Sequence, residues 1–130
     1  MKAAFVNPNV VASSRDPLTT GIVYMPYGLA YAAEAARGAG FEVQVVDAFG
    51  EAPEAVRREG EFLVQGLAPE EVAARVDPGA GLIALYAINL LSHRSTVALL
   101  AALRAPSPNP HRRPRECPGR HGLLPAPRLR

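Results

Sequence analysis

Cysteine, histidine and tryptophan are scarce in this sequence of 130 residues. Its single cysteine, Cys117, excludes a disulfide within the chain and a cysteine-ligated iron–sulfur cluster. Tryptophan is absent, and the three histidines, at positions 93, 111 and 121, do not have the spacing of a metal site. We therefore expect no reaction in this chain that depends on a cysteine-ligated iron–sulfur cluster or on a histidine-ligated metal.

Glycine-rich phosphate loops and long apolar runs are missing as well. The turn after the first apolar run reads NPNVVAS, where a dinucleotide-binding fold would have G-x-G-x-x-G. A Walker motif and a G-x-S-x-G nucleophile elbow are also absent. The run that ends at Asn7 is too short for a signal peptide or a membrane span. We expect a cytoplasmic chain that binds no membrane and has no catalytic residues of its own.

Charge and proline divide the chain in two. Up to Arg104, eight Lys or Arg residues stand against eleven Asp or Glu residues, a net charge of −3. Residues 105–130 hold six Arg, one Glu and seven Pro, so the basic character belongs to this segment. Because proline disrupts helices and strands, we expect a domain over residues 1–105 and a disordered tail over residues 106–130. We expect no specific nucleic-acid partner, although polyanion binding through the tail is an alternative.

The first half of the chain has the pattern of a strand, a helix and a strand. Residues 2–6 are apolar, and residues 41–47 alternate between apolar and polar before closing on Asp47. The alanine-rich stretch between them, opening near Pro26, predicts a helix whose inner face holds Leu29, Ala32, Ala33 and Ala36. A helical crossover between two strands implies that the strands are parallel. Residues 8–24 are expected to form a long loop.

The second half of the chain continues to alternate between predicted helices and strands. It predicts a short helix after residue 50, a small strand at residues 62–64, and a helix from Pro69 to near Val76. GLIALYAI predicts a third buried strand, and Ser92 is a plausible cap for a final helix reaching Arg104. The predicted fold class is α/β, an incomplete doubly wound (Rossmann-like) parallel sheet with flanking helices and a disordered C-terminal tail.

A ligand of such a sheet is expected at the carboxyl ends of its strands. In this sequence those ends are Asn7 and Pro8, residues 47–50, and residues 86–89. The start of the first helix, near Gly28, is expected beside them.

Three segments carry a resemblance to a known family. FVNPN, MPYGLAYAAEAARGAGFEVQVVDAFGE and GLIALYAINLLSHRSTVALLAALR together resemble the N-terminal cobalamin-binding domain of cobalamin-dependent radical S-adenosylmethionine enzymes. The most specific part is P-x-G-L-A-Y followed by G-F-E-V and an aspartate. The resemblance covers residues 1–104.

The resemblance implies a cobalamin-binding module with a small-molecule cofactor. It implies that the cofactor is lined by Asn7, Pro8, Met25, Tyr27, Gly28, Asp47, Tyr86 and Asn89. Many cobalamin domains ligate cobalt through the histidine of Asp-x-His-x-x-Gly, but here the matching positions before Gly28 hold Val23 and Met25. No protein ligand to the metal is therefore expected. In the family, the iron–sulfur cluster and S-adenosylmethionine belong to a catalytic barrel, of methyltransferase or cyclase type, that this chain does not contain.

Two other interpretations remain open at this point. The chain could be a stand-alone flavodoxin-like or nucleotide-binding α/β protein, which a phosphate loop after the first strand would favour. It could also be a non-functional fragment whose end arises from a shifted reading frame, because the family's next strand is replaced by Pro- and Arg-rich sequence after Ala105.

Overall fold

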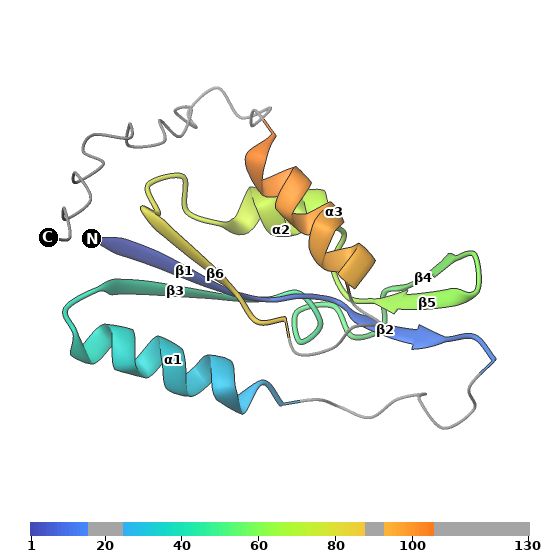
Figure 1. Cartoon of the computed structure of the whole chain (residues 1–130), viewed down its shortest axis with the longest axis horizontal. Helices are drawn as coiled ribbons and strands as arrows, with labels where there is room; N and C mark the ends of the chain where they lie inside the picture. Colours follow the sequence, from blue (N-terminus) through green and yellow to red (C-terminus); the bar gives the residue numbers. More distant parts are fainter. Residues whose placement is uncertain (16–24, 88–92, 106–130) are drawn as a thin grey trace, which may run out of the picture.

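A computed structural model describes residues 1–15, 25–87 and 93–105 of the chain (Figure 1). The elements in chain order are β1 (Lys2–Asn7), β2 (Val10–Ser13), α1 (Tyr27–Gly38), β3 (Glu42–Asp47), β4 (Val56–Glu59), β5 (Phe62–Gln65), α2 (Pro69–Arg75), β6 (Leu82–Leu85) and α3 (His93–Arg104).

The central sheet has three parallel strands in the order β3-β1-β6. β1 pairs with β3 from Lys2 opposite Glu42 to Asn7 opposite Asp47, and with β6 from Ala3 opposite Leu82. Apolar runs bounded by turn formers produce these strands, as the sequence pattern indicated. The predicted α/β class, with a parallel sheet flanked by helices, is confirmed.

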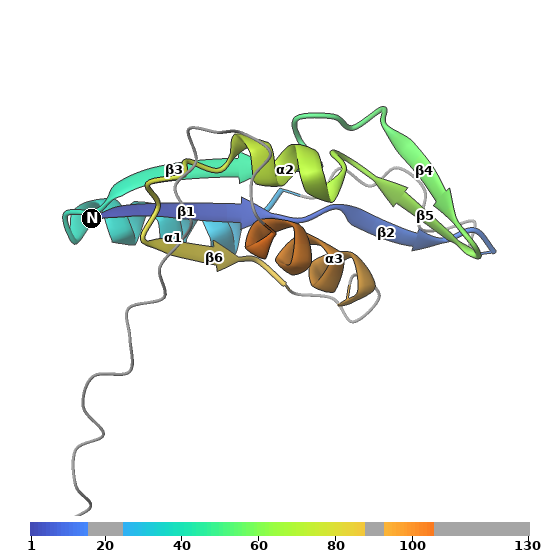
Figure 2. The same cartoon turned by 90° about the horizontal axis from the view of Figure 1, so that it is seen from above.

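Helices cover both faces of this sheet, as Figures 1 and 2 show from two directions. On one face, Ala3 and Phe5 of β1 pack against Leu29 and Ala33 of α1. On the other face, α2 and α3 contact each other over a larger core. Its fully buried side chains include Val6, Val46, Val72, Val76 and Leu99.

The inner face of α1 is narrower than its sequence suggested. Leu29 and Ala33 are buried and Ala36 is half-buried, but Ala32 is exposed. The prediction that Ala32 lies on the inner face was therefore wrong. A helix that packs on one half of a three-stranded sheet buries only a narrow strip of its own surface.

A second sheet, antiparallel and in the order β2-β5-β4, extends from the end of β1. β5 confirms the small strand predicted at residues 62–64. The short helix predicted after residue 50 was wrong, since Val56–Glu59 forms β4 and pairs with β5 through a turn at Gly60. Part of the predicted loop after Asn7 is likewise strand β2, which pairs with β5.

An ion-pair cluster fastens the amino end of the parallel sheet. Lys2 Nζ donates to Asp77 Oδ2 at 2.8 Å and lies 3.3 Å from Glu42 Oε1. The hydrogen bond with Asp77, followed by the one with Glu42, raises the pKa of Lys2. The same bond from Lys2, with the Gly79 N–H, lowers the pKa of Asp77.

Several sequence predictions fall outside the described residues. These are the cap at Ser92, the site residue Asn89 and the tail at residues 106–130, with Cys117. Within the described ranges, none of the helices has the length and apolar content needed to cross a membrane.

Candidate functional site

The carboxyl ends of β1, β3 and β6 meet the first turn of α1, and we call this region the rim. The direction of the strands determines which side chains lie at the rim. Because the three strands are parallel and in register, Asn7, Asp47 and Tyr86 reach the same edge of the sheet. The backbone N–H of Tyr86 donates to the Val6 carbonyl at 2.9 Å, so the ladder continues one residue past β6.

Asn7 and Asp47 form a hydrogen-bonded pair across neighbouring strands. Asn7 Nδ2 donates to Asp47 Oδ1 at 2.8 Å, and the same oxygen accepts the backbone N–H of Gly50 at 2.9 Å. Asn7 is only 5% exposed and the following Pro8 is buried, whereas Asp47 is half-buried. Asn7 therefore orients the Asp47 carboxylate, and Asp47 is the member of the pair that solvent or a ligand reaches.

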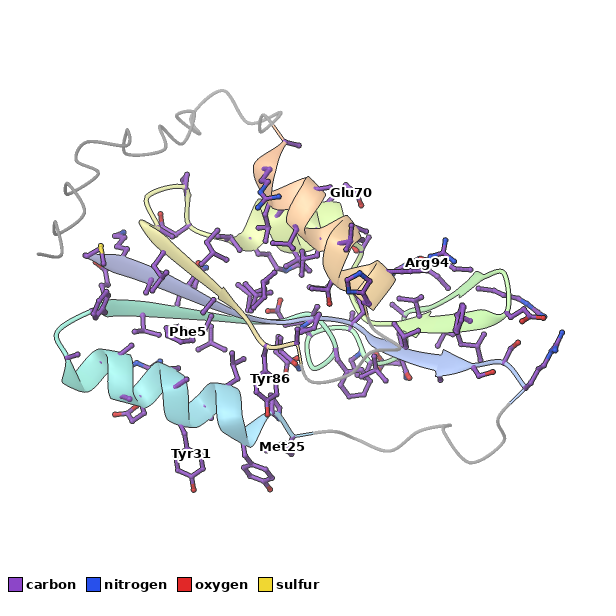
Figure 3. All side chains as sticks on the ribbon, in the orientation of Figure 1. Phe5, Met25, Tyr31, Glu70, Tyr86 and Arg94 are labelled. Atoms are coloured by element: carbon purple, nitrogen blue, oxygen red, sulfur yellow. The ribbon has the colours of Figure 1, made fainter. Side chains whose placement is uncertain are left out.

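Gly28 and Tyr86 are in direct contact at the other side of the rim. A Cβ atom at Gly28 would lie 2.6 Å from Tyr86 Oη and 2.9 Å from its ring. In Figure 3 the Tyr86 side chain extends from the end of β6 toward the start of α1. Because glycine has no side chain, the Tyr86 ring can fill the space between the sheet and the start of α1.

An open depression of about 430 Å³ runs along α1 toward the rim. Its wall combines α1 residues with the edge strand β3, and includes Tyr27, Tyr31, Val45 and Asp47. Tyr27 and Tyr31 are 66% and 77% exposed, and Tyr31 points away from the sheet in Figure 3. Such a surface offers aromatic faces together with the Asp47 carboxylate and the Glu34–Arg37 ion pair.

The remaining predicted residues are Met25 and Asn89. Met25, just before α1, is 59% exposed. Asn89 lies outside the described residues. The structure therefore brings Asn7 to Asp47, Gly28 to Tyr86, and Tyr27 to the depression that Asp47 also lines.

Two features of the site went unrecognised in the sequence. Tyr31 follows Tyr27 by four residues, a spacing that places both on one helix face. Asn9, only 3% exposed, donates through Nδ2 to the Leu67 carbonyl and accepts from Ser95 Oγ at 3.0 Å. No local signal identifies Asn9, because its partners lie far away in sequence. Asn7 and Asn9 thus fix the two sides of the NPN turn.

The described residues hold no group of three or more His, Cys, Asp or Glu side chains that could bind a metal ion. Comparison of the chain with protein-family models, curated proteins and solved structures gave no match.

Replacing Asn7 should reveal how strongly it holds Asp47. We expect Asn7→Ala to lower the free energy of unfolding by about 1–2 kcal/mol, because a buried donor is lost. Asn7→Asp should be worse at pH 7, where two carboxylates face each other, and should recover in acid as one takes up a proton. Urea unfolding at pH 7 and pH 4 measures both. Equal losses for Asn7→Ala and Asn7→Asp at pH 7 would contradict the pairing.

Proposed function

We propose that this chain is a corrinoid-binding module whose ligand lies at the rim. The proposal rests on one structural observation. Gly28, in the first turn of α1, touches Tyr86 at the carboxyl end of β6, so the helix start and the strand ends form one surface. Open α/β sheets bind flat cofactors at that location. The sequence resemblance to cobalamin-binding domains supplies the class of ligand.

The residues around the rim suit a large flat ligand. Met25, Tyr27 and Tyr31 expose apolar and aromatic surface beside it, which a corrin ring can contact through its face. The Asp47 carboxylate can accept hydrogen bonds from the amide groups at the corrin periphery. When bound, the corrinoid supplies a cobalt centre that can carry a methyl group.

Protein ligation of the cobalt is not part of the proposal. Among the described residues His93 is the only histidine, and it opens α3 on the opposite face of the sheet from α1. The residues of this chain would bind and orient the corrinoid and would limit the access of water to one face. Radical chemistry would come from a barrel carrying the iron–sulfur cluster and S-adenosylmethionine, of methyltransferase or cyclase type. The proposal places the module in the cytoplasm.

An absorbance titration with hydroxocobalamin tests the proposal. We expect a saturable change in the corrin bands and retention of the corrinoid on desalting. Tyr27→Ala combined with Tyr31→Ala should weaken binding about tenfold or more, because two aromatic contacts are lost.

Two control variants sharpen this titration. Val56→Ala removes a comparably exposed apolar side chain on β4, away from the rim, and should leave binding unchanged. His93→Ala should leave both binding and spectrum unchanged, because His93 begins α3 on the opposite face of the sheet from α1. Absence of a spectral change together with absence of retention would refute corrinoid binding, and a spectrum altered by His93→Ala would refute the unligated mode.

A further inference from the structure

The outer edge of β6 has no strand partner among the residues that the structure describes. β6 pairs with β1 on one side only, and the sheet order ends with it. Its sequence, LIAL, contains no charge and no proline. Leu82 is 45% exposed and the other three residues are half-buried. An edge of this kind presents free backbone N–H and C=O groups to another strand.

The opposite edge of the same sheet differs in its side chains. β3 carries Glu42 and Gln44, and Glu42 is exposed. Gln44 Nε2 donates to the Arg75 carbonyl, and Gln44 Oε1 accepts from the Asp77 N–H, each at 2.8 Å. Polar and charged residues discourage strand addition at an edge. Among the described strands, β6 is therefore the edge of the parallel sheet that is more open to pairing.

We propose that the β6 edge pairs with the β6 edge of a second copy of this chain. A second copy suits this edge, because every side chain of β6 is apolar and is exposed or half-buried, so that the edge can pair with its own sequence. Two copies related by a two-fold axis would form a continuous sheet in the order β3-β1-β6-β6-β1-β3, with six strands. A self-complementary contact of this type is the usual way in which a protein forms a dimer.

Backbone geometry restricts the register of this pairing, because only residues whose N–H and C=O groups point outward can form hydrogen bonds across the edge. Tyr86 N–H points inward, to the Val6 carbonyl, and strand residues alternate in direction. Ile83 and Leu85 therefore direct their N–H and C=O groups outward. An antiparallel pair centred on Ala84 places Ile83 opposite the partner's Leu85 and forms four backbone hydrogen bonds.

The side chains agree with this register. Ile83 and Leu85 both pack toward the core beneath α2 and α3, so the pair lies on one face in both copies. On the α1 face, Leu82 comes opposite the partner's Tyr86. Each position thus meets an apolar partner, and Ala84, at the two-fold axis, leaves room for close approach.

Disulfide crosslinking tests the register. In the Cys117→Ser background, Ala84→Cys places two thiols at a non-hydrogen-bonded pair, with Cα atoms about 4.5 Å apart, within reach of a disulfide. We expect mild oxidation to give a covalent dimer. Leu82→Cys in the same background is the matched control, on the same face and more exposed, and should stay largely uncrosslinked because its copies lie four residues apart along the paired strands. Equal crosslinking of both variants, or none of Ala84→Cys, would overturn the proposal.

Sedimentation equilibrium tests the dimer itself. We expect the unmodified chain to associate as a dimer, and Leu82→Glu to raise the dissociation constant about tenfold or more, because each copy loses a cross-strand contact and gains a charge. Val56→Glu makes the same change on β4 and should leave the constant unchanged. Circular dichroism checks that both variants fold. A monomer at all concentrations, an open-ended series of oligomers, or equal effects of the two variants would each overturn the inference.

Discussion

Gly66→Ala is expected to destabilise the protein by about 3 kcal/mol, because the added methyl group would clash with neighbouring backbone atoms. Gly66 has a φ of +118°, a conformation that L-residues rarely adopt. A Cβ atom there would lie 2.5 Å from the carbonyl oxygen of Ala48 and 2.9 Å from its carbon. Both atoms are backbone, so no change of rotamer relieves the clash.

The surrounding hydrogen bonds prevent Gly66 from moving away. Its N–H donates to the Ala55 carbonyl at 2.9 Å, and the next residue, Leu67, donates to the same Ala48 carbonyl at 2.8 Å. Arg57 Nη1 donates to the Gly66 carbonyl at 2.7 Å. Because Ala48 directly follows Asp47, this contact also fixes one side of the rim.

Gly60→Ala is the matched control for the Gly66 variant. Gly60 also has a positive φ, of +65°, but nothing lies within 4 Å of the position its Cβ would take. We expect this change to cost about 1 kcal/mol, from backbone conformation alone. Urea unfolding of both variants measures the difference. Losses of similar size would show that the contact with Ala48 is not tight.

The elements that the sequence predicted well are those with local signals. The strands around residues 2–7 and 42–47 are apolar or alternating runs closed by Asn or Asp, and α1 is alanine-rich between Pro26 and two glycines. Their parallel order follows from the helical crossover between them. Turn formers and periodicity act over a few residues, so a single sequence contains this information.

The second sheet could not be predicted in the same way. Residues 56–59 read VRRE, which has no apolar alternation, and they form a strand only because β5 pairs with them. β2 likewise depends on β5, some fifty residues later. The positive φ of Gly60 marks the hairpin turn, and a glycine between two short segments was the available signal.

For the rim, the sequence predicted which residues lie near one another but not which of them contact each other. The family resemblance implies that Gly28 and Tyr86 line a cofactor, and the structure adds that the two residues pack on each other. The resemblance implies the same role for Asn7, and the structure adds that its amide donates a hydrogen bond to Asp47. Such pairings join residues forty or more positions apart. They become visible only when the strand register is known.

The rim also depends on the core on the opposite face of the sheet, where Leu99 is one of the largest fully buried side chains. Leu99, in α3, is fully buried and belongs to the cluster that includes Val6, Val46 and Val72. Leu99→Ala is expected to lower the free energy of unfolding by about 3 kcal/mol, since the transfer energy of the side chain is lost and a cavity remains. For a domain of this size that corresponds to a fall in Tm of roughly 10 °C or more.

Val97→Ala on the same helix separates packing from helix propensity. Val97 is 50% exposed, so its truncation should change the free energy of unfolding by less than about 0.5 kcal/mol. Thermal and urea unfolding of the two variants, with wild type, give the comparison. If Leu99→Ala were as mild as Val97→Ala, α3 could not be packed on the sheet as described. β6, which packs on the same core through Ile83 and Leu85, would then lack that support.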